Sequence, residues 1–162
     1  MSFNGFMNWL KNVAHKLAAS DLFAKIAPKV VPPADRFVHK ISGGRILLGE
    51  MLMPSLLLTS TGAKSGQLRE SPLATIPYRG NTLVIGSNWG GKKHPAWSYN
   101  LIANPDASIS LHGKEIDVRA ELLTSDEKAV AWPEIVSTWP PFDKYVERSG
   151  RDLRVFRLVE RA

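Results

Sequence analysis

Cysteine is missing from all 162 residues of this chain. Its absence excludes disulfides, thiolate nucleophiles and thiolate-held zinc or iron–sulfur centres. Histidine is scarce too, and the four that occur lack metal-ligand spacing, such as two on one helical turn: His15, His39, His94 and His112. We therefore expect no metal site, and the polar chemistry must come from imidazole, carboxylate and hydroxyl groups.

Long apolar runs are also missing. No stretch approaches the roughly 20 apolar residues that span a bilayer, and the first residues lack the apolar run and cleavage site of a signal peptide. The glycines and lysine of residues 62–66 fit neither the dinucleotide fingerprint nor the Walker spacing, and no serine lies in a Gly-x-Ser-x-Gly elbow. The sequence predicts a cytoplasmic protein without a nucleotide loop or a hydrolase nucleophile.

The composition is that of one folded unit. Hydrophobic residues make up 44% and charged residues 22%, far from the signature of disorder. Lysine and arginine outnumber aspartate and glutamate by 21 to 15, so the molecule should attract anions. The basic residues are dispersed, not striped with stacking aromatics, which argues against a nucleic-acid partner.

Residues 1–45 are predicted to form an amphipathic helix and a linker. Apolar residues recur at steps of three and four, as on one helix face: Phe3, Phe6, Met7, Leu10, Val13, Ala14 and Leu17. Pro28 is predicted to end the helix, and residues 30–33 to be extended. Because the other helix side is basic, the helix can lie on an anionic membrane at its inner face, pack on its own domain, or pack on a partner subunit of a homodimer. The sequence leaves these alternatives open.

Residues 46–162 are predicted to form a mainly β domain with flanking helices. Short β-type runs cover residues 55–60, 73–78, 82–87, 107–111, 115–122 and 154–159. Turns at residues 79–81 and 112–113 should close antiparallel hairpins. Helices are expected from Pro95 to Asn104 and from Thr124, which forms a capping box with Glu127, toward Trp139. Hairpin connections exclude a doubly wound parallel sheet and favour a small antiparallel barrel.

Two loops concentrate the residues that bind anions. Residues 59–69 offer hydroxyls, backbone amides and two cations in one connection. Residues 87–97 join a strand end, two glycines, two lysines and a helix N-terminus. Each loop alone is equally typical of an ordinary polar connection. Together in one small domain they indicate an elongated anionic ligand.

At these loops the chain resembles the deazaflavin (coenzyme F-420)-dependent nitroreductase family of actinobacteria. The resemblance rests on residues 57–69, 72–73, 86–88, 94–101 and 103–105. It implies a split β-barrel like the FMN-binding split barrel, with coenzyme F-420 as cofactor. It covers roughly Leu47 to the C-terminus.

The resemblance also implies roles for individual residues. Lys64 and Arg69 match cations that hold the acidic tail, and the amides of residues 87–91 match the loop beside the ring and phosphate. The implied cofactor-binding set is Thr61, Gly62, Lys64, Ser65, Arg69, Pro72, Leu73, Ser87, Asn88, Trp89, Gly90, Gly91, Lys93 and Trp97. Trp139, Phe142 and Tyr145 match the substrate pocket, and Ser87 and Tyr145 are the candidate catalytic hydrogen-bond donors.

The family's activity would be hydride transfer from the reduced deazaflavin to an electron-poor acceptor: an enone, an unsaturated lactone, a quinone or a nitroaromatic. The chain departs from the pattern at Ala63, where the family commonly has arginine, and Trp139 and Phe142 stand where the nitroimidazole-reducing branch carries tyrosines. Flat lactones and quinones are therefore expected to be the better acceptors. Two alternatives stay open: a non-catalytic carrier of the coenzyme, and a related split-barrel protein that binds FMN or haem.

Overall fold

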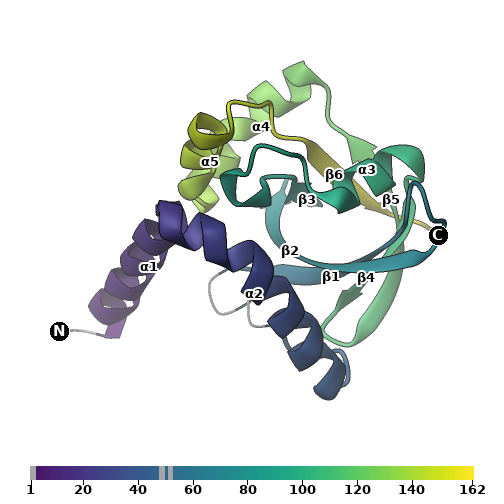
Figure 1. The fold of residues 1–162 in the computed structure, drawn as a ribbon, viewed down its shortest axis with the longest axis horizontal. Coiled ribbons are helices and arrows are strands. Elements are labelled where there is room, and N and C mark those ends of the chain that lie inside the picture. The colour runs from purple at the N-terminus through teal and green to yellow at the C-terminus, as the bar shows by residue number, and fades with distance from the viewer. Residues whose placement is uncertain (1–2, 48–49, 51–52) are drawn as a thin grey trace.

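The computed structural model describes residues 3–47, 50 and 53–162, with the side chains of residues 3–8, 10 and 11 outside this description. The expected apolar positions Phe3, Phe6, Met7 and Leu10 thus lie outside the described side chains. Six antiparallel strands close into one barrel in the order β1-β2-β3-β6-β5-β4 (Figure 1). Their bounds are Ser55–Thr61, Leu68–Tyr78, Asn81–Ile85, Asp106–Leu111, Lys114–Leu122 and Val155–Glu160 for β1 to β6. The predicted barrel with flanking helices is confirmed.

The two predicted hairpin turns are confirmed. Tyr78 pairs with Asn81 and Leu111 pairs with Lys114, so each turn has two central residues. In both turns the two central residues have positive φ, which matches the right-handed twist of the strands: 48° and 77° at Arg79-Gly80, and 49° and 80° at His112-Gly113.

Strand β2 is longer at its start than predicted, and β3 is shorter at its end. The prediction began β2 at Leu73, but β1 pairs with it back to Leu68. Strand β3 pairs only with residues 75–78 of β2 and ends at Ile85 instead of Ser87. One edge of the first half of β2 therefore has no β3 neighbour, which is the edge position where a proline such as Pro72 is tolerated.

Three further α-helices lie between strands of the barrel: α3 between β3 and β4, and α4 and α5 between β5 and β6. The expected helix after Pro95 is α3 (Ala96–Ala103), and the capping box of Thr124 and Glu127 starts α4 (Ser125–Thr138) as predicted. Helix α5 (Pro141–Ser149) was not predicted. It is short, and its opening pair Pro140-Pro141 is equally typical of a turn, although proline is well suited to the first helical turn.

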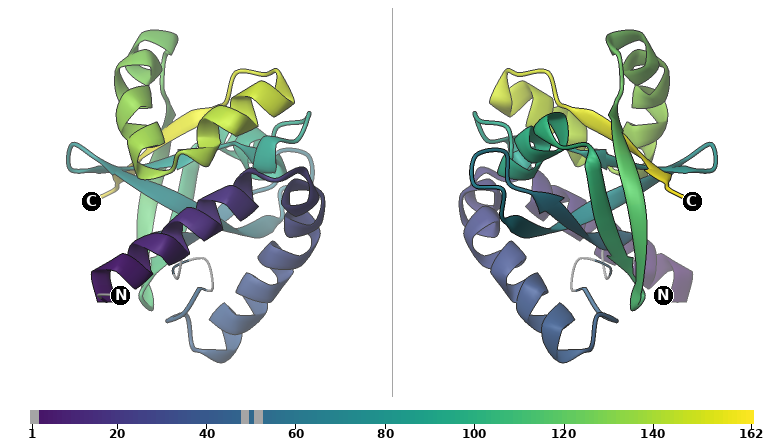
Figure 2. Two further views of the ribbon diagram at one scale, coloured as in Figure 1. Left: turned by 90° about the vertical axis from the view of Figure 1, so that its left-hand side faces the viewer. Right: turned by 90° about the vertical axis from the view of Figure 1, so that its right-hand side faces the viewer.

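The predicted linker at residues 30–33 is wrong. The chain forms α1 (Phe3–Ala19) and then α2 (Asp21–Ile41), with Pro28, Pro32 and Pro33 inside α2. Ser20 separates the two helices as the N-cap of α2, where its hydroxyl accepts from the Phe23 amide. A proline inside a helix costs ~3 kcal/mol or more. Packing offsets this cost, because α2 lies along β2 and buries Ala27 and Asp35 (Figures 1 and 2).

Two apolar clusters hold these elements together, and the alternation of side chains along each strand separates them. Val84 and Phe156 point into the barrel with eight other buried residues, including Trp97 and Leu101 of α3. Leu83 and Ile85 point outward, where they pack with residues of α1, α4 and α5. The barrel interior is thus filled by its own side chains. No described helix is long and apolar enough to cross a bilayer.

Candidate functional site

A cavity of about 610 Å³ lies outside the barrel, between β2, the loop after β3, the N-terminal helices and α5. This volume is in the range of small-molecule and cofactor sites, which are mostly apolar with a few polar groups. Nine of the residues predicted from the sequence line it: Pro72, Leu73, Ser87, Asn88, Trp89, Trp97, Trp139, Phe142 and Tyr145. The structure therefore brings the predicted ring-binding strand, the second loop and the predicted substrate pocket to one place.

The position of the cavity follows from the strand register. Beyond the Thr75–Val84 pair, β2 continues toward Ser71 while β3 ends and the chain leaves as residues 86–95. The part of β2 that has no β3 neighbour, Ser71 to Ala74, and the departing loop form two walls of the cavity.

The N-terminal helices form a third wall, which the sequence analysis missed. Phe23, Pro28, Val31 and Asp35 of α2 line the cavity, as do Leu17 and Ala18 of α1. Asp35 is only 4% exposed. This wall was missed because the prolines were interpreted as the end of a helix. A signal was available, since one helix face is marked by apolar or buried residues at steps of four: Phe23, Ala27, Val31 and Asp35.

The remaining predicted cofactor residues lie outside the cavity lining: Thr61, Gly62, Lys64, Ser65, Arg69, Gly90, Gly91 and Lys93. Lys64, Ser65, Arg69 and Lys93 are exposed. Among the described residues, no three His, Asp or Glu side chains lie close enough together to hold a metal ion.

The first loop is attached to α3 by two amide side chains, the buried Asn100 and the half-buried C-cap residue Asn104. Asn100 of α3 accepts from the Ala63 amide (3.0 Å) and donates to the Ser60 hydroxyl (3.1 Å), and Asn104 donates to the Thr61 carbonyl (3.4 Å). The second loop runs directly into the N-terminus of the same helix. Since a helix rises 1.5 Å per residue, Asn100 lies only about 6 Å along the axis from Ala96. Helix α3 therefore brings the two predicted anion-binding loops together.

The second loop has an unusual backbone. Asn88 and Trp89 both have positive φ, 46° and 56°, which is uncommon for residues with side chains. Gly90 follows with φ 76°, and a Cβ there would lie 3.2 Å from both the Arg148 side chain and the Tyr145 backbone. The absence of a side chain at Gly90 therefore allows the loop to pack directly against α5. This packing also places the Trp89 ring against Phe23 of α2, with ring centroids 5.5 Å apart.

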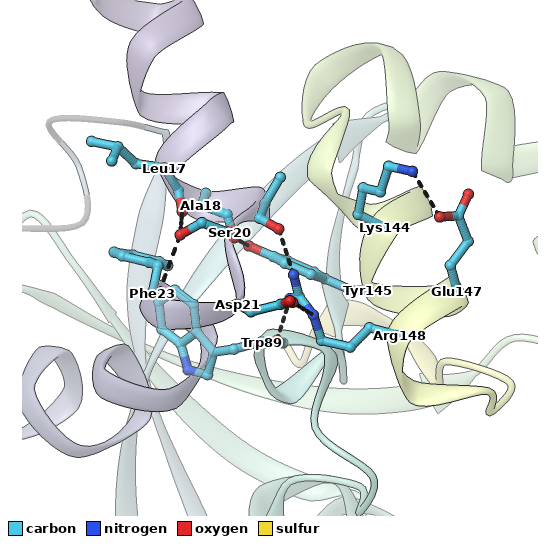
Figure 3. Close-up of polar contacts among 11 residues, drawn as sticks. Leu17, Ala18, Ser20, Asp21, Phe23, Trp89, Lys144, Tyr145, Glu147 and Arg148 are labelled. Atoms are coloured by element: carbon cyan, nitrogen blue, oxygen red, sulfur yellow. Dashed lines mark hydrogen bonds and ion pairs between the residues drawn. The ribbon is translucent and has the colours of Figure 1, made fainter.

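Arg148 of α5 connects this loop to the corner between α1 and α2 (Figure 3). Its guanidinium donates to the Trp89 carbonyl (3.3 Å), pairs with Asp21 (2.9 Å) and donates to the Ala19 carbonyl. Lys144, on the same helix, instead pairs with Glu147.

Tyr145 contacts the same corner from inside. Its hydroxyl donates to the Ala18 carbonyl (3.2 Å), and burial raises the pKa of this phenol (Figure 3). A phenol has one proton to donate. In this conformation the Ala18 carbonyl of α1 accepts that proton, so the hydroxyl has none to donate to a ligand, although Tyr145 lines the cavity. The Ser87 hydroxyl makes no hydrogen bond within the described part of the chain and also borders the cavity.

Relatives in sequence agree with the expected cofactor. The Mycobacterium tuberculosis protein Rv3178 is 36% identical over 109 residues, which cover 67% of this chain and 92% of that protein. The F420H(2)-dependent quinone reductase Rv1261c of the same species is 30% identical over 134 residues, covering 78% of this chain and 81% of the relative.

Solved structures agree with the fold. An F420-H2 dependent reductase (FDR-A) matches with TM-score 0.58 and 34% identity over 65% of this chain and 94% of that one. A structure described as a domain-swapped dimer matches with TM-score 0.61 and 31% identity over 76% and 95%. The haem storage protein HutZ of Vibrio cholerae, at 15% identity over 69% of this chain and 84% of that one and TM-score 0.51, shares the fold alone.

The family model described as F420H(2)-dependent quinone reductase matches residues 34–160, which include the barrel, both loops and the C-terminal end of α2 from residue 34. The predicted membership of a deazaflavin-dependent reductase family is thereby confirmed, and with it the use of coenzyme F-420. This chain belongs to the F420H(2)-dependent quinone reductase family.

Proposed function

We propose that this chain reduces a quinone with reduced coenzyme F-420, and that both molecules meet in the cavity beside β2. The observation that carries the proposal is the shared cavity itself. Residues that the family resemblance assigns to the deazaflavin ring, Pro72, Leu73 and Trp97, line it together with residues assigned to the acceptor, Trp139 and Phe142.

The cavity chemistry suits two flat aromatic partners. Its walls are mostly apolar and carry the large rings of Trp89, Trp139 and Phe142, whose faces favour stacking. Reduced deazaflavin supplies a hydride when bound, so the protein has to bind, orient and exclude water. The exposed cations Lys64 and Arg69 lie outside the cavity, as residues that hold an acidic tail would.

Negative charge develops on a quinone oxygen during reduction, and a donor aimed at that oxygen lowers the barrier. We assign this role to the Ser87 hydroxyl, because Ser87 lines the cavity and its hydroxyl makes no hydrogen bond within the described part of the chain. The Tyr145 hydroxyl can serve only after it leaves the Ala18 carbonyl. We therefore assign Tyr145 first to holding α1 in place, and only second to donating a proton to the acceptor.

The decisive experiment combines binding with turnover. Oxidised coenzyme F-420 and FMN are titrated by fluorescence, and reduced coenzyme F-420 is then mixed with a menadione-like quinone. We expect coenzyme F-420 to bind far more tightly than FMN, with affinity that falls as salt rises, and the quinone to be reduced. Tight binding without turnover would identify a carrier, and equal affinity for both flavins would identify a less selective split-barrel protein.

Removing either first-loop cation tests the tail site. Lys64→Ala and Arg69→Ala should each weaken coenzyme binding by roughly 1–3 kcal/mol, the range for a charge-assisted hydrogen bond. Arg79→Ala is the matched control, because Arg79 is another hairpin cation at the opposite end of β2. The measurement is the dissociation constant from fluorescence titration. Equal affinities in all three variants would place the tail elsewhere.

The acceptor range beyond quinones follows from the cavity rings. Trp139 and Phe142 are almost fully buried and add no hydroxyl, so enones and unsaturated lactones should be reduced better than a bicyclic nitroimidazole. A well-placed donor is worth about 100-fold or more in turnover. An unoptimised hydroxyl in Phe142→Tyr should thus raise nitroimidazole turnover by about tenfold, with a smaller change for a quinone.

Phe37→Tyr is the control for this substitution, because it adds the same hydroxyl on the exposed side of α2. Initial rates with the three acceptor classes provide the readout. A wild-type protein that already prefers the nitroimidazole would show that Trp139 and Phe142 do not line the acceptor site.

The outer face of α2 fits the surface of an anionic membrane, from which a lipid-soluble quinone would enter the cavity behind the helix. Five apolar side chains on one helix face are about half or more exposed: Leu22, Ile26, Val30, Phe37 and Ile41. Four exposed cations accompany them: Lys25, Lys29, Arg36 and Lys40. An apolar face bordered by cations is typical of helices that lie in the headgroup region.

We expect the protein to co-sediment with anionic vesicles and the double variant Leu22→Glu/Phe37→Glu to stay in solution. Val130→Glu, which changes an exposed apolar residue of α4, should bind vesicles like the wild type. Gel filtration of the same proteins tests the homodimer. A wild-type dimer that the double variant converts to monomers, without vesicle binding, would assign the face to a second copy of the chain.

A further inference from the structure

The side chain of Arg151, just after α5, forms hydrogen bonds along the second loop. Four of the five guanidinium N–H donors are used on this one loop. Nε donates to the Gly91 carbonyl (2.9 Å), Nη1 to the Gly86 carbonyl (2.9 Å) and Nη2 to the Ser87 carbonyl (2.6 Å). Nη1 also lies 2.9 Å from Nδ1 of His94. A single side chain therefore spans residues 86–94, almost the entire connection between β3 and α3.

These bonds orient the loop amides. In a trans peptide the carbonyl of one residue and the N–H of the next point in opposite directions. Because the Ser87 and Gly91 carbonyls point at Arg151, the N–H groups of Asn88 and Lys92 point away from it. Neither amide donates a hydrogen bond within the described part of the chain, and Asn88 borders the cavity. Arg151 thus turns both amides away from itself and leaves them free to donate, and Asn88 is the one of the two that lines the cavity.

The charge of Arg151 is also left without a counter-charge. No carboxylate pairs with it among the described residues, and the adjacent Asp152 pairs with Lys128 instead. Burial lowers the pKa of Arg151, and the nearby Arg154 adds to this effect. Burial likewise lowers the pKa of His94, with Arg154 and Arg151 contributing, which favours the neutral imidazole whose Nδ1 can accept from Arg151. An anion on the far side of the loop would compensate a positive charge that the fold itself leaves uncompensated.

We propose that Arg151 is the positioning residue of the second loop, which shapes its backbone amides to receive a phosphate group of the coenzyme. The inference rests on the proposed function for the identity of the ligand. It concerns a residue outside every segment that carries the family resemblance. Arg151 acts through the loop backbone and does not itself line the cavity.

The test separates loop geometry from charge. Arg151→Lys keeps the charge but cannot reach three carbonyls and His94 at once, since lysine has a single nitrogen on a flexible stem. Arg154→Met is the matched control. It removes a positive charge beside the same loop, but the Arg154 guanidinium stacks on Tyr99 (4.3 Å) and bonds Ser98 instead of the loop carbonyls. Thermal unfolding of each variant tests whether the fold is retained.

Two readouts are independent of turnover. The first is the dissociation constant for oxidised coenzyme F-420. The second is the shift of the Asn88 and Lys92 amide resonances when inorganic phosphate is titrated into the full-length protein. We expect Arg151→Lys to weaken coenzyme binding at least tenfold and to abolish the phosphate-induced shifts. Arg154→Met should change the affinity less than threefold and keep the shifts.

Wild-type affinity in Arg151→Lys, or an equal loss in both variants, would overturn the inference. In the first case the loop needs no such clamp. In the second, loss of an arginine that does not bond the loop carbonyls is as damaging as loss of the clamp, so the effect is not specific to Arg151. Millimolar guanidinium added to Arg151→Ala should partly restore the phosphate-induced shifts, which a purely structural loss of the side chain would not allow. If the wild-type protein shows the phosphate shifts but does not bind coenzyme F-420, the proposed function fails while the role of Arg151 stands.

Discussion

The filled interior of a six-stranded barrel is the constraint on which the rest of this structure depends. Barrels with about eight strands have interiors just wide enough for side chains, and here Phe156, Val84 and their neighbours pack inside a barrel of six. The candidate cofactor cavity accordingly lies outside the wall. The wall offers one such place where β3 ends at Ile85 and β2 continues with β1 as its only strand neighbour. The helices α1, α2 and α5 convert that open edge of β2 into a cavity.

Because the cavity lies between elements, its walls must be joined to one another by contacts that are far apart in the sequence. Arg148 connects α5 to the α1–α2 corner and to Trp89, and Arg151 connects the chain after α5 to residues 86–94. Most of these bonds end on backbone carbonyls, which any residue could provide. The positions of the two arginines thus matter more than the identities of most residues that they hold. Their hydrogen bonds also stabilise the strained loop, in which the consecutive non-glycine residues Asn88 and Trp89 have positive φ.

The barrel by itself does not decide the ligand. A haem storage protein shares the architecture at 15% identity, so the same strands support different chemistry. The residues on which the family resemblance rests lie largely in two connections of this chain: a first loop attached to α3 by Asn100 and a second loop held by Arg151, with cations on both. Their convergence on α3 explains why an elongated anionic ligand could be inferred from two loops that are separated by a whole strand pair.

The sequence by itself determined the local features. Alternating apolar residues, two-residue turns at Gly80 and Gly113 and the Thr124–Glu127 capping box act over a few residues, and they predicted the barrel strands, its hairpins and α4. Motifs at residues 57–69 and 86–101 indicated the cofactor family for the same reason. Only the tertiary structure decided the course of α2 through three prolines, because the packing that offsets their cost comes from β2. It likewise decided that Tyr145 bonds Ala18 and that Arg151 holds Gly86 and Gly91, since a long-range hydrogen bond leaves no periodic trace in the residues that make it.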